Sequence, residues 1–372
     1  MRRSVRILKF TAVMLSAAAC TAAGTQLIPL MQSVQVGTAQ NAAAATASEA
    51  TQETTAPPAA QTVPLPQAEA AAPETGAIAF ESSASAAMHN ARPYQNPLTD
   101  IAGSIVRTHF GAQTGKLFFS LDGGGQVRNS TFWSNEDLLA ESRLLPELPL
   151  KTDGTPTVLI YHTHTTESYQ LTAAEGYDTA FNFRTTEPDK NVVAVGDAIA
   201  AQLTAAGIGT VHAAEIHDYP VWNKSYTRSA QTVRSVLEQY PDICISLDIH
   251  RDAISSGTTV TAPVAEIGGK QSAQIMIISG CDDGTMDMPD YRANFHFASI
   301  LQQKAETMYQ GFTRPIMFDY RKYNQDLTGA HGASLLIEVG SQGNTLAEAA
   351  YAGELLGKAL AETILYLAHT TR

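Results

Sequence analysis

The sequence has few cysteines and no excess of positive charge. Three cysteines occur among 372 residues, and only Cys244 and Cys281 lie beyond the first 31 residues. An exported domain with two cysteines can form at most one disulfide, which excludes a disulfide scaffold. Cys244 lies in an apolar run typical of a buried strand, so we expect a buried thiol there. The formal net charge of −12 argues against a nucleic-acid partner.

Lysine and arginine are absent between Lys9 and Arg92, although four basic residues precede this gap. Residues 10–31 carry no charge at all. At about 1.5 Å per residue, this apolar stretch is long enough to cross a bilayer core of roughly 30 Å. We therefore expect residues 1–31 to be a membrane anchor, with the amino terminus in the cytoplasm and the rest exported. A cleaved signal peptide and a lipoprotein are the alternatives, although Cys20 lacks the leucine usual three residues before a lipidated cysteine.

Aromatic residues are nearly absent from residues 32–92, a segment rich in Ala, Thr, Pro and Glu in which Phe80 stands alone. Such a composition buries too little apolar surface to offset the entropy of ordering, which predicts a disordered tether. Residues 93–150 follow as a β-rich extension, with a hairpin expected around the glycine-rich turn of 116–131.

Residues 151–372 alternate between apolar strands and helices. The expected strands are 157–164, 209–215, 243–250, 272–280 and 334–340, and the expected helices are 191–207, 225–240, 291–309 and 345–368. This alternation predicts an α/β fold with a mostly parallel central sheet flanked by helices. The short return between residues 250 and 272 indicates that part of the sheet is antiparallel, so the sheet is mixed.

Polar side chains stand where three of these strands end. His162 and His164 end the first, His250 ends the third and Glu338 lies in the last. Each could be structural, as a strand cap or half of a salt bridge. Together they would place several buried polar groups at one sheet edge, where ligand sites of α/β sheets gather.

Two histidines and one carboxylate, with an open position for water, form a common catalytic zinc shell. Zinc lowers the pKa of its water to about 7, and a further carboxylate can then move the proton. Serine chemistry lacks support, because no GxSxG motif occurs. The strand ends therefore predict a Zn²⁺ hydrolase.

Five segments resemble the stage II sporulation protein P family. They are LIYHTHTTESY, FNFRTTEPDKNVVAVGDAI, SLDIHRDA, YNQDL and LLIEVGSQGNTLAEA. The resemblance covers roughly residues 100–370 and includes the anchored, exported layout. It implies a fold like that of zinc-dependent N-acetylmuramoyl-L-alanine amidases. It also implies a peptidoglycan amidase and endopeptidase that acts in forespore engulfment, between the mother-cell and forespore membranes.

The resemblance also implies roles for single residues. By the amidase pattern, His164, Glu187 and His250 are the zinc ligands and Glu338 is the proton shuttle. Lysine does not follow Glu187 as the pattern requires, so Glu167 and Glu175 stay open as the third ligand. The residues expected to contact the ligands or the substrate are His162, Glu167, Asp248, Arg251 and Asp252.

The expected partners are peptidoglycan, the membrane and two sporulation proteins, stage II sporulation protein D (a lytic transglycosylase) and stage II sporulation protein M. Two other functions remain open from the residues. A zinc deacetylase of the glycan needs the same water chemistry, and a non-catalytic wall-binding module would use the histidines structurally. The endopeptidase cleavage site and the oligomeric state do not follow from the sequence.

Overall fold

The computed structural model describes residues 78–80, 101–179, 182–329 and 332–370. The predicted anchor and nearly all of the predicted tether lie outside these ranges. Among the described residues, no helix is both long and apolar enough to cross a membrane. The anchor therefore stays a prediction.

The centre of the fold is a nine-stranded mixed sheet in the order β1-β7-β5-β8-β14-β12-β13-β4-β3. Its strands are β1 (Ile78–Phe80), β3 (Phe118–Ser120), β4 (Gln126–Asn129), β5 (Pro156–Tyr161), β7 (Gly209–Ala213), β8 (Ile245–Asp252), β12 (Ile275–Gly280), β13 (Ile316–Asp319) and β14 (Ala333–Ser341). All neighbours are parallel except β12 with β14 and β3 with β4. The mixed, mostly parallel α/β sheet is confirmed, as is the hairpin at 116–131.

A second sheet of five strands was not predicted. It joins β11 (Lys270–Ala273), β10 (Thr259–Ile267), β2 (Ile101–Thr108) and β6 (Gly176–Asp178), with β9 (Ser255–Ser256) beside β10. The return between residues 250 and 272 thus leaves the central sheet and forms most of this smaller one.

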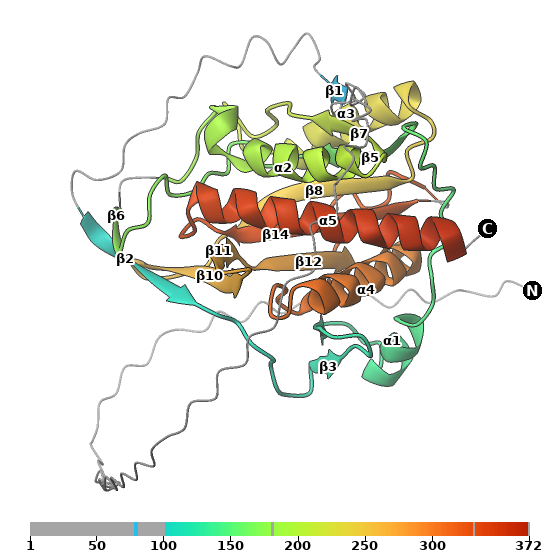
Figure 1. Cartoon of the computed structure of the whole chain (residues 1–372), viewed down its shortest axis with the longest axis horizontal. Coiled ribbons are helices and arrows are strands. Elements are labelled where there is room, and N and C mark those ends of the chain that lie inside the picture. Colours follow the sequence, from blue (N-terminus) through green and yellow to red (C-terminus); the bar gives the residue numbers. More distant parts are fainter. Residues whose placement is uncertain (1–77, 81–100, 180–181, 330–331, 371–372) are drawn as a thin grey trace, which may run out of the picture. The chain divides into compact units, whose positions relative to one another are not determined.

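Helices cover both faces of the central sheet. They are α1 (Asn135–Glu141), α2 (Val192–Ala205), α3 (Ser225–Gln239), α4 (Tyr291–Met308) and α5 (Leu346–Thr370), with a short 3₁₀ helix, η1 (Pro188–Lys190). Figure 1 shows α2, α5 and α4 side by side in front of the sheet. Their apolar side chains share one core with Val158 and Ile160 of β5, whereas Leu159 and Tyr161 point to the opposite face, where α3 packs.

Two glycines of α5 let it approach α2 closely. A Cβ on Gly353 would lie 2.9 Å from the carbonyl oxygen of Val195, and a Cβ on Gly357 would lie 2.9 Å from that of Ile199. The two helices therefore lie against the sheet as a tight pair, which fixes the loop at the start of α2 beside the carboxyl ends of the strands.

The described part of the predicted extension, residues 101–150, contributes strands to both sheets: β2 pairs with β10 in the second sheet and β4 pairs with β13 in the first. Three residues of the segment expected to be disordered, Ile78–Phe80, form a strand parallel to β7. The thiols of Cys244 and Cys281 are free and buried, which confirms the expectation for Cys244.

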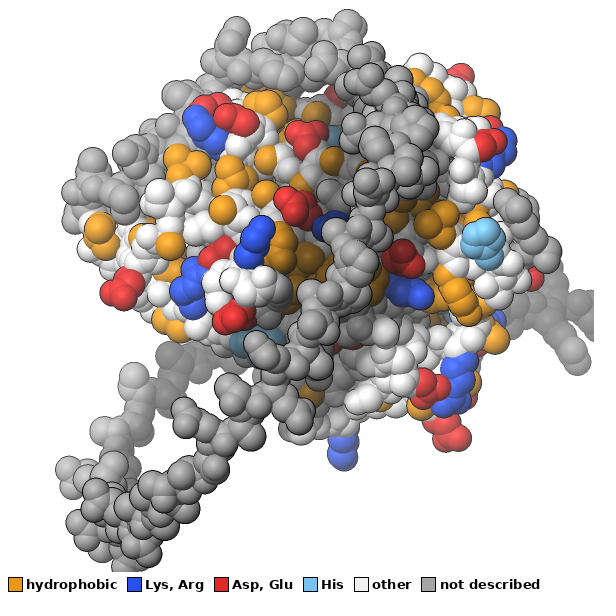
Figure 2. Space-filling model, in the orientation of Figure 1, with side chains coloured by type: hydrophobic (Ala, Val, Ile, Leu, Met, Phe, Trp, Pro, Cys, Tyr) orange, Lys and Arg blue, Asp and Glu red, His pale blue; other side chains and the backbone are white. Residues whose placement is uncertain are grey.

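On the surface in Figure 2, acidic and basic side chains are interspersed with small hydrophobic areas. This mixed surface gives the chain's negative net charge no single focus on the face shown.

Candidate functional site

The three strands that end in polar residues are neighbours in the central sheet. β8 lies between β5 and β14 and is parallel to both. Tyr161, the last residue of β5, pairs with Asp248, and Glu338 pairs with His250. The structure therefore brings these polar groups together at the carboxyl ends of three adjacent central strands.

His164 and His250 form the centre of this gathering. Their ring centroids lie 5.3 Å apart, nearly perpendicular to each other. The Nδ1 atom of His164 lies 3.3 Å from the Ser225 hydroxyl, at the start of α3, and 4.0 Å from the Asp218 carboxylate. Burial and the neighbouring His250 lower the pKa of His164. Its neutral imidazole is suited to ligate a metal.

His250 lies between two carboxylates. Its Nε2 atom is 2.8 Å from Oδ1 of Asp248, and its Nδ1 atom is 3.5 Å from Oε2 of Glu167. Burial alone would lower the pKa of His250, but the two carboxylates outweigh it and raise the pKa well above its ordinary value. The Thr163 backbone and hydroxyl hold Asp248 in place at 2.8 and 2.6 Å. A carboxylate on one ring nitrogen commonly orients a metal-binding histidine and leaves the other nitrogen free for the metal.

Glu167 is the carboxylate that the fold brings to the histidines. A tight turn connects it to His164, because its backbone N–H donates to the His164 carbonyl at 3.0 Å. Burial would raise the pKa of Glu167, but Arg251, His250 and Arg184 together lower it. Arg251 also donates to the carbonyl oxygens of Ser168 and Phe183, at 3.3 and 3.1 Å, and so fixes the loop that carries Glu167.

Glu338 lies beside His250 on β14, and its Oε2 atom is buried without a hydrogen-bond partner among the described residues. Burial raises the pKa of Glu338 to about 8, against the effect of His250 and with the help of Asp252. An unpaired buried carboxyl is costly, so it points to a site that a ligand or reacting group completes.

His162 belongs to a different hydrogen-bond network from that of His164 and His250. Its Nδ1 atom lies 2.9 Å from the Ile249 carbonyl and its Nε2 atom 2.9 Å from Nε2 of His212. Burial and His212 lower the pKa of His162 to about 3. The Ile249 contact joins His162 to the residue before His250, which is consistent with an indirect role.

The remaining predicted residues lie elsewhere in the site region. Glu187 precedes η1 and forms an ion pair with Lys190. Glu175 is exposed, and its backbone carbonyl accepts a hydrogen bond from the backbone N–H of Ile105 in β2. Asp252 binds Arg314 at 2.8 Å. The ligand role of Glu187 stays a prediction, but the contact with His250 belongs to Glu167.

Aromatic residues around the histidines were missed from the sequence. Trp222 stacks on His164 with ring centroids 5.1 Å apart and an angle of 11°. Tyr226 of α3 meets His164 edge-on at 5.6 Å and lies 6.2 Å from Tyr323. Tyr323 and the next residue adopt left-handed backbone conformations, which non-glycine residues rarely adopt outside functional sites. The sequence did carry one signal for this aromatic group. The chain has two tryptophans, and one of them lies in the polar segment DYPVWNK, where a large apolar side chain is unusual.

The donor chemistry of this cluster fits zinc. Two imidazoles and a carboxylate, His164, His250 and Glu167, are present within one buried site, and the unpaired Oε2 of Glu338 stands beside them. In the part of the chain that the structure describes, no three such side chains are already arranged as a formed metal site. Convergence of these ligands would therefore accompany metal binding.

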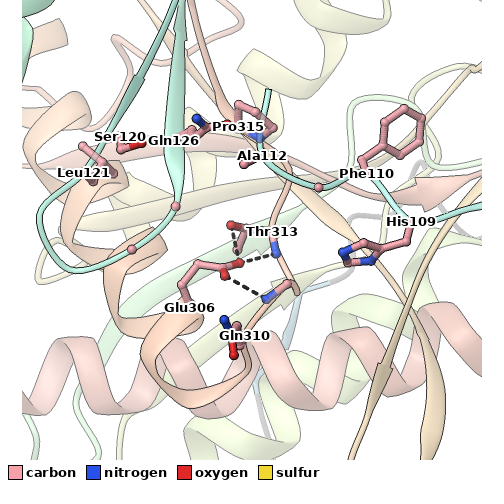
Figure 3. Close-up of a pocket in the computed structure, with 14 residues that line it drawn as sticks. His109, Phe110, Ala112, Ser120, Leu121, Gln126, Glu306, Gln310, Thr313 and Pro315 are labelled. Atoms are coloured by element: carbon pink, nitrogen blue, oxygen red, sulfur yellow. Dashed lines mark hydrogen bonds between the residues drawn. The ribbon is translucent and has the colours of Figure 1, made fainter. Parts of the chain in front are cut away.

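A cavity of about 570 Å³ lies away from the histidines, between the extension and the end of α4. Figure 3 shows Glu306 in its wall, with hydrogen bonds to the backbone N–H groups of Gly311 and Thr313 and to the Thr313 hydroxyl. That carboxylate holds the turn after α4. The Glu306 carboxylate in this cavity thus has hydrogen-bond partners, unlike Oε2 of Glu338.

The model of the stage II sporulation protein P family matches residues 33–361. The chain belongs to this family. Stage II sporulation protein P of Bacillus subtilis (strain 168) is 32% identical over 218 residues, which are 54% of this chain and 49% of that protein. The match thus spans about half the length of the curated relative.

Solved structures of N-acetylmuramoyl-L-alanine amidases also align with the chain. The amidase AmiC2 of Nostoc punctiforme aligns with 58% of this chain and 99% of its own, at 12% identity and a TM-score of 0.35. The N-acetylmuramoyl-L-alanine amidase of Clostridium difficile 630 aligns with 58% of this chain and 98% of its own, at 14% identity and a TM-score of 0.35.

Proposed function

We propose that the protein is a zinc-dependent peptidoglycan hydrolase that cleaves the amide between N-acetylmuramic acid and L-alanine. The observation that carries the proposal is the juxtaposition of His164, His250 and Glu167 with the unpaired carboxyl of Glu338 at one sheet edge. Membership of the stage II sporulation protein P family supports peptidoglycan as the substrate and sporulation as the setting.

His164, Glu167 and His250 would hold the zinc ion. When bound, zinc would lower the pKa of a water molecule so that it ionises near neutral pH and can attack an amide. The Asp248 carboxylate lies 2.8 Å from Nε2 of His250 as an ion pair, and Nδ1 of the same ring faces Glu167 at 3.5 Å. Arg251 holds the loop of Glu167, and the pairing of β8 with β14 holds the strand of His250, so the fold places these two segments and the side chains would converge on the metal.

Glu338 would take the proton of the attacking water and deliver it to the leaving nitrogen. A group that both accepts and donates works best with a pKa near the working pH. Burial raises the pKa of Glu338 to about 8 in the metal-free chain, and the charge of a bound zinc ion would lower it toward the range in which the carboxylate can accept the proton. The broader setting is also proposed: a membrane-anchored enzyme in the space between the engulfing membranes, with endopeptidase activity on cross-links and with stage II sporulation proteins D and M as partners.

The first experiment is a digest of purified sacculi by the full chain, with the products identified by mass. We expect free stem peptides with an L-alanine amino terminus. Release of acetate without stem peptide would replace the proposal with a deacetylase, and binding without any product would replace it with a wall-binding module.

The third ligand is tested by a matched pair of variants, Glu167→Ala and Glu187→Ala. We expect Glu167→Ala, like His164→Ala and His250→Ala, to lower the bound zinc strongly, since each removes one ligand of three. Glu187→Ala and His162→Ala should retain it. Glu338→Gln should keep zinc and lose turnover by a factor of about 100 to 10,000. Loss of zinc in Glu187→Ala but not in Glu167→Ala would restore the assignment implied by the family pattern.

A further inference from the structure

An exposed tryptophan lies directly over one of the proposed zinc ligands. Trp222 is 55% exposed, and His164 stacks on one face of its indole ring at 5.1 Å. Because His164 covers that face, the exposed area lies on the opposite face and at the ring edges. A large apolar ring held in solvent beside a reactive site is a typical contact surface for a binding partner.

The loop that carries Trp222 is fixed without a ligand. Arg228 of α3 donates to three carbonyl oxygens of the loop, those of His217, Val221 and Asn223. The carbonyl of Trp222 itself accepts from the backbone N–H of Ser225 at 3.2 Å and from its hydroxyl at 2.9 Å. Ser225 also contacts His164, so one helix start positions the tryptophan and the histidine together. A ring held in place in advance loses little conformational entropy when a ligand stacks on it.

We propose that the open face of Trp222 stacks on a sugar ring of the glycan strand next to the scissile amide. This inference rests on the proposed function, because it needs the glycan to reach His164. A pyranose ring presents a row of C–H groups on one face, which pack flat against an aromatic ring. A cation would instead favour aromatic faces on several sides, and here His164 already occupies one face of the indole.

Tyr226 and Tyr323 extend the aromatic surface from Trp222 toward His250. Tyr226 lies edge-on to His164, and its ring is nearly parallel to that of His250, at an angle of 16° and a distance of 6.5 Å. Both tyrosines are partly buried, whereas Trp222 is exposed. We therefore assign the sugar contact to Trp222, and the tyrosines form the wall that leads to the reacting bond.

Fluorescence tests the inference without turnover. The chain has two tryptophans, so Trp133→Phe leaves Trp222 as the single reporter. We would titrate this variant, in the full chain, with the disaccharide of N-acetylglucosamine and N-acetylmuramic acid and separately with the stem peptide. We expect the disaccharide, but not the peptide, to change Trp222 emission in a saturable way. A response to the peptide alone, or to neither ligand at millimolar concentration, would overturn the inference.

Kinetics separates this inference from the proposed function. Stacking of a ring on an aromatic side chain is worth about 1–3 kcal/mol in nucleic-acid binding, so Trp222→Ala should raise KM for sacculi by a factor of about 5 to 150 with the zinc content unchanged. Trp222→Phe should recover most of the loss. Stem-peptide release with an unchanged KM in Trp222→Ala would reject the sugar contact and keep the amidase. A disaccharide response without any hydrolysis by the wild type would reject the amidase and keep the sugar contact.

Discussion

Replacing Glu338 by glutamine should stabilise the metal-free protein at alkaline pH and not at acidic pH. Burial raises the pKa of Glu338 from 4.5 to about 8 in the folded chain, whereas the unfolded chain has the ordinary value. Below pH 4.5 the carboxyl is neutral in both the folded and the unfolded state, so its contribution to the free energy of unfolding is fully present. Between pH 4.5 and 8 it ionises first in the unfolded chain, so the folded state loses stability as the pH rises.

The size of the effect follows from the two pKa values. One pKa unit corresponds to about 1.4 kcal/mol, so the wild type should lose about 3 kcal/mol by pH 7, about 4 kcal/mol by pH 8 and about 5 kcal/mol well above pH 8. Glutamine cannot ionise and avoids this loss. For a chain of this size each kcal/mol moves Tm by about 2–4 °C, so the difference between the two proteins should exceed 5 °C.

The assay is thermal and urea unfolding of both proteins at pH 5 and pH 8.5, after removal of metal with a chelator. The decisive quantity is how the stability difference between Glu338→Gln and wild type changes with pH. The glutamine amide itself changes the stability by an amount that does not depend on pH, and this amount cancels in the comparison. Glu306→Gln is the matched control: its carboxylate accepts three hydrogen bonds, so its loss should destabilise the protein at both pH values. A difference between Glu338→Gln and wild type that does not grow with pH would refute the reasoning.

Three further predictions follow from the packing. Gly196→Ala should lower the free energy of unfolding by about 1–3 kcal/mol in urea titrations despite a better helix propensity, because its Cβ would lie 2.5 Å from His212 and 2.9 Å from His162. The two buried cysteines should react with a thiol reagent only after unfolding, since burial raises the pKa of each to about 12. Fragment 70–372 should melt at a higher temperature than fragment 93–372, which lacks β1 and leaves β7 as an open edge.

The central sheet could be predicted because its strands are short apolar runs between amphipathic helices. β8 and β14 are buried on both faces, and such strands are recognisable without knowing their partners. The second sheet could not be predicted in this way. β2 and β10 lie more than 150 residues apart in the chain, and their alternating burial depends on a partner that no local pattern identifies.

The site was predictable to the extent that it lies on strands. His250 and Glu338 are fixed by the register of β8 and β14, so their proximity follows from the topology alone. The third donor depends on the course of a loop. Glu167 reaches His250 because the chain turns back directly after His164, whereas the family pattern placed the carboxylate at Glu187. Trp222 lies in a loop without periodicity, and only its contacts with α3 reveal its place.

His162 and His164, which are separated by one threonine, have different environments because β5 ends earlier than its apolar run suggests. The strand stops at Tyr161, so the alternation that would direct both side chains to one face no longer applies. His162 joins a chain of three contacts, from the exposed Asp197 to His212, from His212 to His162 and from His162 to the Ile249 carbonyl. Burial lowers the pKa of His162 to about 3, so its ring is neutral. The Ile249 carbonyl can only accept, so Nδ1 of His162 donates to it. His162 thus fixes β5 against β8 as a neutral donor, and this contact sets the spacing between the loop of His164 and the strand of His250.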